Sequence, residues 1–286
     1  MQRLVNFLRY LDKRSFLGFK VWEFSLQSLF RPYGLWFLKR IVLRHPLATL
    51  KGLIRYRELV ARNALGGAVN LISLGSPAEL LEEPQSLVIA LGYCQKPFGC
   101  PAGRFTPHCL LPEHCPQDCP LKGLIQAGLA LGAKIYVMTS ALRIGQDLLL
   151  PALEEGNPSK ILAFVCPYSL HPFALACLIC GLRGVILTFG RGACSDYSSW
   201  LLADKGIKPE QTSISSEGEM LLTKLFQPLL EDDPDPRNLP ARGVNLWRES
   251  PYEGAKRGRV ANPSKPAHEW DPKPWQTLRK RGRELP

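Results

Sequence analysis

Five cysteines and two histidines lie within 29 residues, in the stretch "GYCQKPFGCPAGRFTPHCLLPEHCPQDCP" from Gly92 to Pro120. Thiolate and imidazole groups are the usual ligands of zinc and of iron–sulfur clusters. The gaps between the cysteines are five, eight, five and three residues, so they match neither the paired CxxC of a zinc ribbon nor the C-x2-C-x2-C core of a bacterial ferredoxin. The stretch therefore predicts a metal or redox site without naming the metal.

Length and composition argue against a disulfide scaffold. A chain of 286 residues that is 45% hydrophobic can bury a substantial core of its own, and nine cysteines cannot all pair. The start, "MQRLVNFLRYLDKRSF", is broken by charges and lacks the apolar run of a secretory signal. We therefore expect a cytoplasmic protein, in which clustered cysteines usually bind metal or react.

Four apolar runs rich in β-branched residues alternate with helical patterns, which predicts an α/β fold with a mostly parallel sheet and helices on both faces. The predicted strands are Ser86 to Tyr93, Lys134 to Ser140, Lys160 to Cys166 and Gly184 to Gly190. A further short strand is expected in "AVNLISLG". The helices are "LKGLIQAGLALG", "RIGQDLLLPALEEG" and "HPFALACLICGLRG", each ending near a glycine, as helix ends often do.

Several cysteines follow the ends of these strands. Cys94 comes directly after the first strand, Cys166 ends the third, and Cys194 follows the fourth. Parallel strands deliver their carboxyl ends to one edge of the sheet, where ligands of open α/β folds bind, so we expect these residues to meet there. The long connection after Cys94 belongs to the same edge. The candidate metal ligands are Cys94, Cys100, Cys109, Cys115, Cys119, Cys166 and Cys194.

Two other patterns carry weaker signals. Gly190, Arg191 and Gly192 could form a turn that binds an anionic cofactor through backbone N–H groups, and a plain turn before a helix N-cap is the alternative. Cys177 and Cys180 form a CxxC, but they lie in an apolar helical pattern where core packing explains them better. No catalytic motif identifies a reaction, so whether the protein is an enzyme stays open.

Residues 1–62 form a basic, aromatic-rich segment with 13 Lys and Arg against 3 Asp and Glu, within a net charge of +11. Apolar and basic residues alternate as in a helix that lies on an anionic membrane surface, here the inner face of the membrane. Helices packed on the core are an equal alternative. Binding of nucleic acid ranks lower, because leucine and phenylalanine exceed what base stacking requires. No window is long and uncharged enough to span a bilayer.

The chain thus divides into three regions: the helical segment 1–62, a Cys-rich α/β domain at 63–230, and a largely irregular tail rich in proline and charge at 231–286.

The runs "HCLLPEHCPQDCPLKGLIQAGLALGAKIYVMTSALRIGQDLL", "ILAFVCPYSL" and "LTFGRGACSD" resemble a family of uncharacterised bacterial and archaeal proteins, domain of unknown function 116. The resemblance covers roughly residues 86–210. It implies an α/β unit with important cysteines, which correspond here to Cys109, Cys115, Cys119, Cys166 and Cys194. This chain has "CPQDCPLKGL" where the family is expected to have a CxxCGxC-like run, and the family implies no established activity.

Three functions follow as hypotheses. The first is a protein associated with a membrane surface that holds an iron–sulfur cluster, or zinc as the alternative, at the carboxyl edge of its sheet. The second is a metal-free thiol enzyme in which Cys166 or Cys194 is a thiolate near Arg191 and a helix N-terminus. The third is a membrane-binding scaffold with a structural zinc. The sequence names neither a small-molecule substrate nor a redox partner.

Overall fold

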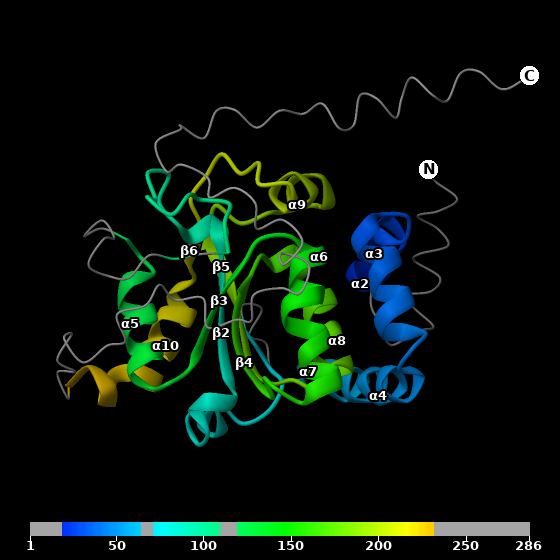
Figure 1. Ribbon diagram of the computed structural model, residues 1–286, viewed down its shortest axis with the longest axis horizontal. Coiled ribbons are helices and arrows are strands. Elements are labelled where there is room, and N and C mark those ends of the chain that lie inside the picture. Colours follow the sequence, from blue (N-terminus) through cyan, green and yellow to red (C-terminus); the bar gives the residue numbers. More distant parts are fainter. Residues whose placement is uncertain (1–18, 64–70, 108, 110–118, 232–286) are drawn as a thin grey trace, which may run out of the picture. The chain divides into compact units, whose positions relative to one another are not determined.

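The computed structural model describes residues 19–63, 71–107, 109 and 119–231, and within these ranges six strands form one sheet (Figure 1). All of them fall in one unit, Met1–Arg248. The strands are β1 (Leu71–Ser73), β2 (Leu87–Gly92), β3 (Lys134–Met138), β4 (Lys160–Val165), β5 (Arg183–Arg191) and β6 (Ser213–Ile214). Their order is β1-β5-β4-β2-β3, with β6 paired to β5. Strands β2 to β5 are parallel, and β1 and β6 run antiparallel to β5, so the predicted mostly parallel sheet is confirmed.

The helices cover both faces of this sheet. Their bounds are α5 (Lys122–Ala130), α6 (Ala141–Ile144), α7 (Leu150–Glu155), α8 (Leu170–Ile179), α9 (Tyr197–Asp204) and α10 (Ser216–Glu231), and a π-helical turn, Gly145–Leu149, joins α6 to α7. In β2, Leu87, Ile89 and Leu91 belong to the apolar cluster that includes α5 and α10. The alternate residues Val88 and Ala90 belong to the cluster that includes α7 and α8. Burial on both faces explains why these strands are continuously apolar.

Three N-terminal helices lie outside α8: α2 (Phe19–Ser28), α3 (Pro32–Phe37), which continues as a π-helical turn at Leu38–Val42, and α4 (Pro46–Asn63) (Figure 1). Gly52 of α4 lies so close to α8 that a Cβ there would be 2.5 Å from Ile179 Cα. Tyr56 is buried in the same contact and its hydroxyl is 3.0 Å from His171 Nδ1. Helices of the basic segment are therefore packed on the α/β core.

The strand order creates a crevice at the carboxyl edge. From β2 the chain crosses to β3 on one side of β2, and it then returns to β4 on the other side of β2. Where the order of an open α/β sheet reverses in this way, the connections diverge and leave room for a ligand. Cys94 and Cys166 follow the two strands on either side of this point.

The predicted strands agree with the observed ones to within one or two residues at most ends. The short strand expected in "AVNLISLG" is β1. Cys177 and Cys180 are buried at the end of α8, as core packing predicts. Among the described residues, no helix combines the length and the apolar character that a membrane span requires. The predicted tail lies, apart from the end of α10 at Glu231, outside the described residues.

Candidate functional site

Three of the predicted cysteines lie buried at the carboxyl edge of the sheet. Cys94 is in the 3-10 turn Tyr93–Gln95 after β2, Cys166 directly follows β4, and Cys194 is in the turn between β5 and α9. Cys166 and Cys194 are in direct contact, since the backbone N–H of Cys194 donates to Cys166 Sγ at 3.2 Å. Their side chains are 28 positions apart in sequence, so only the parallel sheet brings them together.

A buried lysine completes this group. Lys208 lies in the loop after α9, and its ammonium nitrogen is 2.9 Å from Cys194 Sγ and 3.9 Å from Cys166 Sγ. Its side chain is 8% exposed, so the charge requires a partner in the protein. We call Cys94, Cys166, Cys194 and Lys208 the cysteine–lysine site.

The thiols of this site differ in acidity. The Cys166 thiol donates a hydrogen bond to the Cys194 sulfur, and this bond, with the Lys208 ammonium, outweighs burial and lowers the pKa of Cys194 to about 6. The same hydrogen bond, together with burial, raises the pKa of Cys166 far above its ordinary value. Burial also raises the pKa of Cys94, although the Thr212 hydroxyl donates to its sulfur at 3.2 Å. At neutral pH the site therefore holds one thiolate, Cys194, beside neutral thiols.

The lysine responds to the same charges. Burial alone lowers the pKa of Lys208, but the neighbouring sulfurs of Cys166 and Cys194 outweigh that effect, so its pKa is raised. The ammonium form is thus stabilised at neutral pH, which favours the Cys194 thiolate in return.

Arg104 holds the Lys208 loop in place. Its guanidinium donates to the carbonyls of Lys208 and Glu210, the latter at 2.6 Å, and to the carbonyl of Cys94 at 3.3 Å. The backbone N–H of Thr212 donates to the Cys94 carbonyl at 3.0 Å. These bonds join the Lys208 loop to the turn after β2, so Arg104 determines where the ammonium lies.

Glycines permit the close approaches around the site. A Cβ at Gly92 would lie 2.8 Å from the Phe189 ring and 3.1 Å from Cys94 Sγ. Gly192 has φ +65°, and a Cβ there would lie 2.6 Å from the Gln211 carbonyl oxygen in the Lys208 loop.

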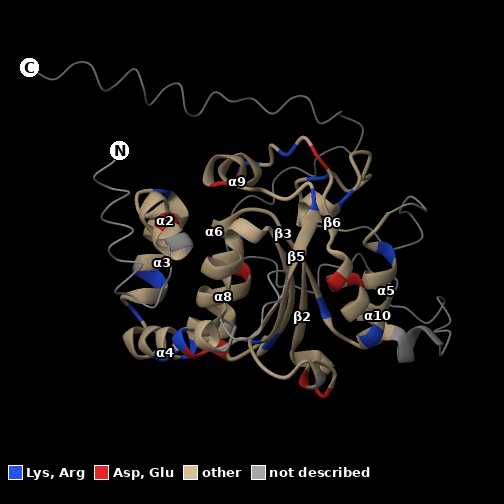
Figure 2. Cartoon of the chain, turned by 180° about the vertical axis from the view of Figure 1, so that it is seen from behind, with Lys and Arg blue, Asp and Glu red and all other residues tan. Residues whose placement is uncertain are grey.

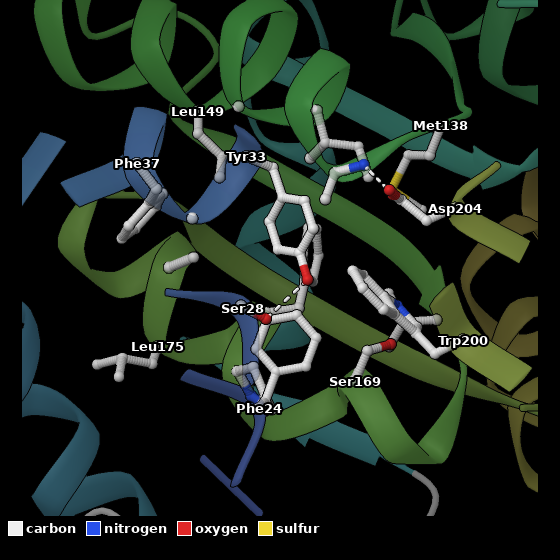
Figure 3. Close-up of a pocket in the computed structure, with 18 of the residues that line it drawn as sticks. Phe24, Ser28, Tyr33, Phe37, Met138, Leu149, Ser169, Leu175, Trp200 and Asp204 are labelled. Atoms are coloured by element: carbon white, nitrogen blue, oxygen red, sulfur yellow. Dashed lines mark hydrogen bonds between the residues drawn. The ribbon is translucent and has the colours of Figure 1, made fainter. Parts of the chain in front are cut away.

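A cavity of about 540 Å³ opens beside the cysteine–lysine site, and Figure 3 shows part of the cavity wall. All four residues of the site line it, as do Met138 and Asp204 at the same edge of the sheet. The rest of the wall is mainly apolar and comes largely from α2, α3, α4, α8, and α6 with the π-helical turn after it. The volume lies in the range of about 300–1,000 Å³ that is typical of small-molecule sites. The N-terminal helices are therefore part of the cavity wall.

An aromatic cluster attaches those helices beside the cavity. The Phe24 ring meets the Trp200 ring edge to face at 4.8 Å, and Tyr33 lies 5.4 Å from Trp200 (Figure 3). The hydroxyls of Tyr33 and Tyr197 are 2.8 Å apart. Because α9 follows Cys194 directly, this cluster links the N-terminal helices to the turn that carries the thiolate.

The remaining predicted site residues are not part of the cysteine–lysine site. Cys109 and Cys119 are buried in the apolar cluster that also contains the three site cysteines, and Cys100 is half-buried in the loop after Cys94. Cys115 lies outside the described residues. Gly190 and Arg191 are exposed at the end of β5, and Gly192 makes the backbone approach given above. Among the described residues no three His, Cys, Asp or Glu side chains are grouped so as to hold a metal ion.

Sequence patterns indicate a ligand site at this edge of the sheet, but they give no indication of Lys208, of Arg104 or of the apolar wall that the N-terminal helices contribute. Lys208 lies in "KGIKPE", which reads as a polar surface loop, and no motif surrounds it. For residues 1–62, the alternative that these helices pack on the core is the expectation that leads to their place beside the cavity.

No family model, curated protein or solved structure matches the chain. The resemblance to domain of unknown function 116 stays a prediction.

Proposed function

We propose that the protein is a thiol-dependent enzyme in which the Cys194 thiolate attacks an electrophile bound in the cavity. One observation carries this proposal: Cys194 Sγ lies 2.9 Å from the buried Lys208 ammonium, in the wall of a cavity large enough for a substrate. A thiolate is the reactive form of cysteine, and a neighbouring cation is the usual means of stabilising it. Cys166 assists by donating a hydrogen bond to the thiolate.

Site-selective alkylation tests this proposal. The purified chain is treated briefly with iodoacetamide at pH 7, and each cysteine is quantified by peptide mass spectrometry. We expect Cys194 to be labelled first and Cys94 and Cys166 much more slowly. The Cys194→Ser variant should lose the fast phase, whereas Cys177→Ser, at a buried position in α8, should keep it. Equal and slow labelling of Cys94, Cys166 and Cys194 would refute the thiolate role.

A metal centre is the second candidate, because the structure gathers several thiols at one edge. Its ligands would come from Cys94, Cys166 and Cys194, with Cys100, Cys109, Cys115 and Cys119 in or near the long loop. The Lys208 ammonium is a poor fit to this reading, since it already neutralises the thiolate and would repel a metal cation. Iron, zinc and acid-labile sulfide measured after anaerobic purification decide the matter: a stoichiometric metal that Cys166→Ser removes would favour a metal centre, iron–sulfur or zinc according to the ion found.

We also propose that the outer face of the N-terminal helices binds an anionic membrane surface. Leu43, Leu47, Leu50 and Ile54 are spaced by three or four residues and are all more than half exposed. This spacing places Leu47, Leu50 and Ile54 on one face of α4, and Leu43 lies in the turn before that helix. Exposed Lys and Arg flank them, namely Lys39, Arg40, Arg44, Lys51 and Arg55, and Figure 2 shows basic positions along these helices. An apolar stripe with a basic border suits a helix lying among anionic head groups.

Vesicle flotation tests this surface. We expect the chain to float with vesicles of phosphatidylglycerol and phosphatidylcholine, less at high salt, and to lose binding in Leu47→Glu. The control Met220→Glu changes an exposed apolar residue on α10 and should bind as before. If the unmodified chain stays unbound at low salt, the proposed surface is wrong.

A further inference from the structure

The cavity beside the cysteine–lysine site is long and apolar away from the sulfurs. Ser169, just before α8, and Ile179, its last residue, both line the cavity. Ten residues of helix rise about 15 Å, so the cavity follows α8 for about that length. Near Ile179 the wall also includes Thr49 and Leu53 of α4. The Thr49 hydroxyl already donates to the His45 carbonyl at 3.0 Å, so this end offers a ligand mainly apolar contact.

The polar groups of the wall gather at the other end. Lys208 and Cys194 lie at the carboxyl edge of the sheet, together with Asp204, which accepts a hydrogen bond from the Ala141 N–H at 2.6 Å. A ligand that matches both ends has a polar, electrophilic head and an extended hydrocarbon chain. Short or uniformly polar molecules would leave the α8 end without favourable contact.

We propose that the cavity binds the hydrocarbon chain of an acyl thioester and that Cys194 takes over the acyl group, an inference that rests on the thiolate role proposed above. The Cys194 sulfur attacks the carbonyl carbon, a new C–S bond forms, and the C–S bond to the departing thiol breaks. The negative charge passes from Cys194 to the departing thiolate, which takes a proton from water as it leaves. No oxidant or metal is required, because one thioester is exchanged for another.

The position of Lys208 suits both sides of this exchange. Before attack, its ammonium lies 2.9 Å from the Cys194 thiolate sulfur. The departing sulfur takes over the negative charge close to that position, so the same ammonium stabilises it. Cys166 donates to the Cys194 thiolate, so it loses its acceptor when the acyl group is transferred and is then free to donate to the new thioester oxygen. The aliphatic chain along α8 fixes the carbonyl carbon near the sulfur, which converts the encounter into an intramolecular reaction.

Acyl transfer is tested with the full chain and three probes: the acetyl, octanoyl and dodecanoyl thioesters of coenzyme A, below micelle-forming concentrations. Intact mass and peptide mapping follow acylation of Cys194. We expect dodecanoyl transfer to exceed acetyl transfer by at least about tenfold, since each fully buried methylene favours binding by up to roughly fourfold. In Thr49→Trp and Ala176→Trp, which fill the apolar end, the dodecanoyl-to-acetyl ratio should fall toward one.

The control Glu58→Trp puts the same side chain at an exposed position of α4 and should keep the high ratio. Two replacements on different helices guard against misfolding of either variant. Fast iodoacetamide labelling of Cys194 with no preference for chain length overturns the acyl-thioester inference and leaves the thiolate role intact. Absence of iodoacetamide labelling at Cys194 overturns the thiolate role itself. If the preference for long acyl chains persists in both cavity-filling variants, the acyl chain binds outside this cavity, which also refutes the inference.

Discussion

Replacing Lys208 with methionine tests the electrostatics of the cysteine–lysine site most directly. Methionine keeps much of the side-chain length but removes the ammonium 2.9 Å from Cys194 Sγ. The pKa of Cys194 is about 6 in the intact site, and the Cys166 hydrogen bond contributes the largest share. Since a close opposite charge typically lowers a pKa by about one to three units, alkylation of Cys194 should move its midpoint from near pH 6 to between about pH 7 and pH 9.

The size of the rate change depends on the pH of the assay. With a midpoint moved to about pH 8, the thiolate fraction at pH 7 falls from about 91% to about 9%, a tenfold loss. A more basic thiolate is also more nucleophilic, and with a Brønsted slope of about 0.4–0.5 the rate constant of each thiolate rises roughly eightfold. The two effects nearly cancel at pH 7. At pH 5 the thiolate fraction falls about ninetyfold, so the net loss there is roughly tenfold.

The assay is therefore a full pH profile. Initial rates of iodoacetamide labelling at Cys194 are measured between pH 4.5 and 9.5 by peptide mass spectrometry. Lys205→Met, which removes a charge from an exposed position in the same loop, is the matched control and should keep the midpoint near pH 6. A midpoint near pH 9 in the unmodified chain, or the same midpoint in Lys208→Met, would show that the ammonium does not stabilise this thiolate.

Three further outcomes are expected. The pKa of Cys194 is lower in the folded chain than its ordinary value of 9.0, so its contribution to stability is present above pH 9 and is lost as the pH falls through about 6. The free energy of urea unfolding should therefore rise with pH between about 6 and 9, by up to ~1.4 kcal/mol per pH unit, and Cys194→Ala should remove this pH dependence. Arg104→Met removes hydrogen bonds to Lys208, Glu210 and Cys94, so the labelling midpoint should rise and unfolding should require about 1.5–3 kcal/mol less; an unchanged midpoint would mean that the loop is held otherwise. Gly92→Ala overpacks the Phe189 ring and Cys94 Sγ and should destabilise by about 1–3 kcal/mol, whereas Gly99→Ala, which meets nothing within 4 Å, should not; equal effects of the two would contradict the crowding.

The sheet and part of the site followed from local patterns. Strands β2 to β5 are buried on both faces, so their sequences are continuously apolar and the turns between them are marked by glycine and proline. Once the strands were parallel, the residues after them had to share one edge, which is why Cys94, Cys166 and Cys194 could be placed together. This argument predicts which residues share an edge of the sheet, but it does not predict the distances between their side chains. Among the described residues, no three or more His, Cys, Asp or Glu side chains are grouped so as to hold a metal ion.

Lys208 was beyond the reach of sequence patterns because its burial depends on contacts between distant segments. A lysine in a polar loop is usually solvated, and this one is covered because Arg104, about a hundred residues earlier, binds the carbonyls around it. Gly192 then allows the loop to approach β5. The N-terminal helices pose the same difficulty, since their periodicity shows which side chains are apolar but not which surface they cover.

Charge balance connects these observations to function. A buried thiolate needs a counter-charge, and one ammonium beside one thiolate and two neutral thiols makes the cysteine–lysine site neutral as it stands. A metal ion bound by the same sulfurs would require them all to ionise and the Lys208 ammonium to leave its position 2.9 Å from Cys194 Sγ. The two readings therefore respond oppositely to Lys208→Met: removing the ammonium weakens a nucleophilic Cys194 at low pH, whereas it relieves repulsion at a metal site and should raise zinc affinity. Parallel measurement of alkylation and of zinc binding in this one variant separates them.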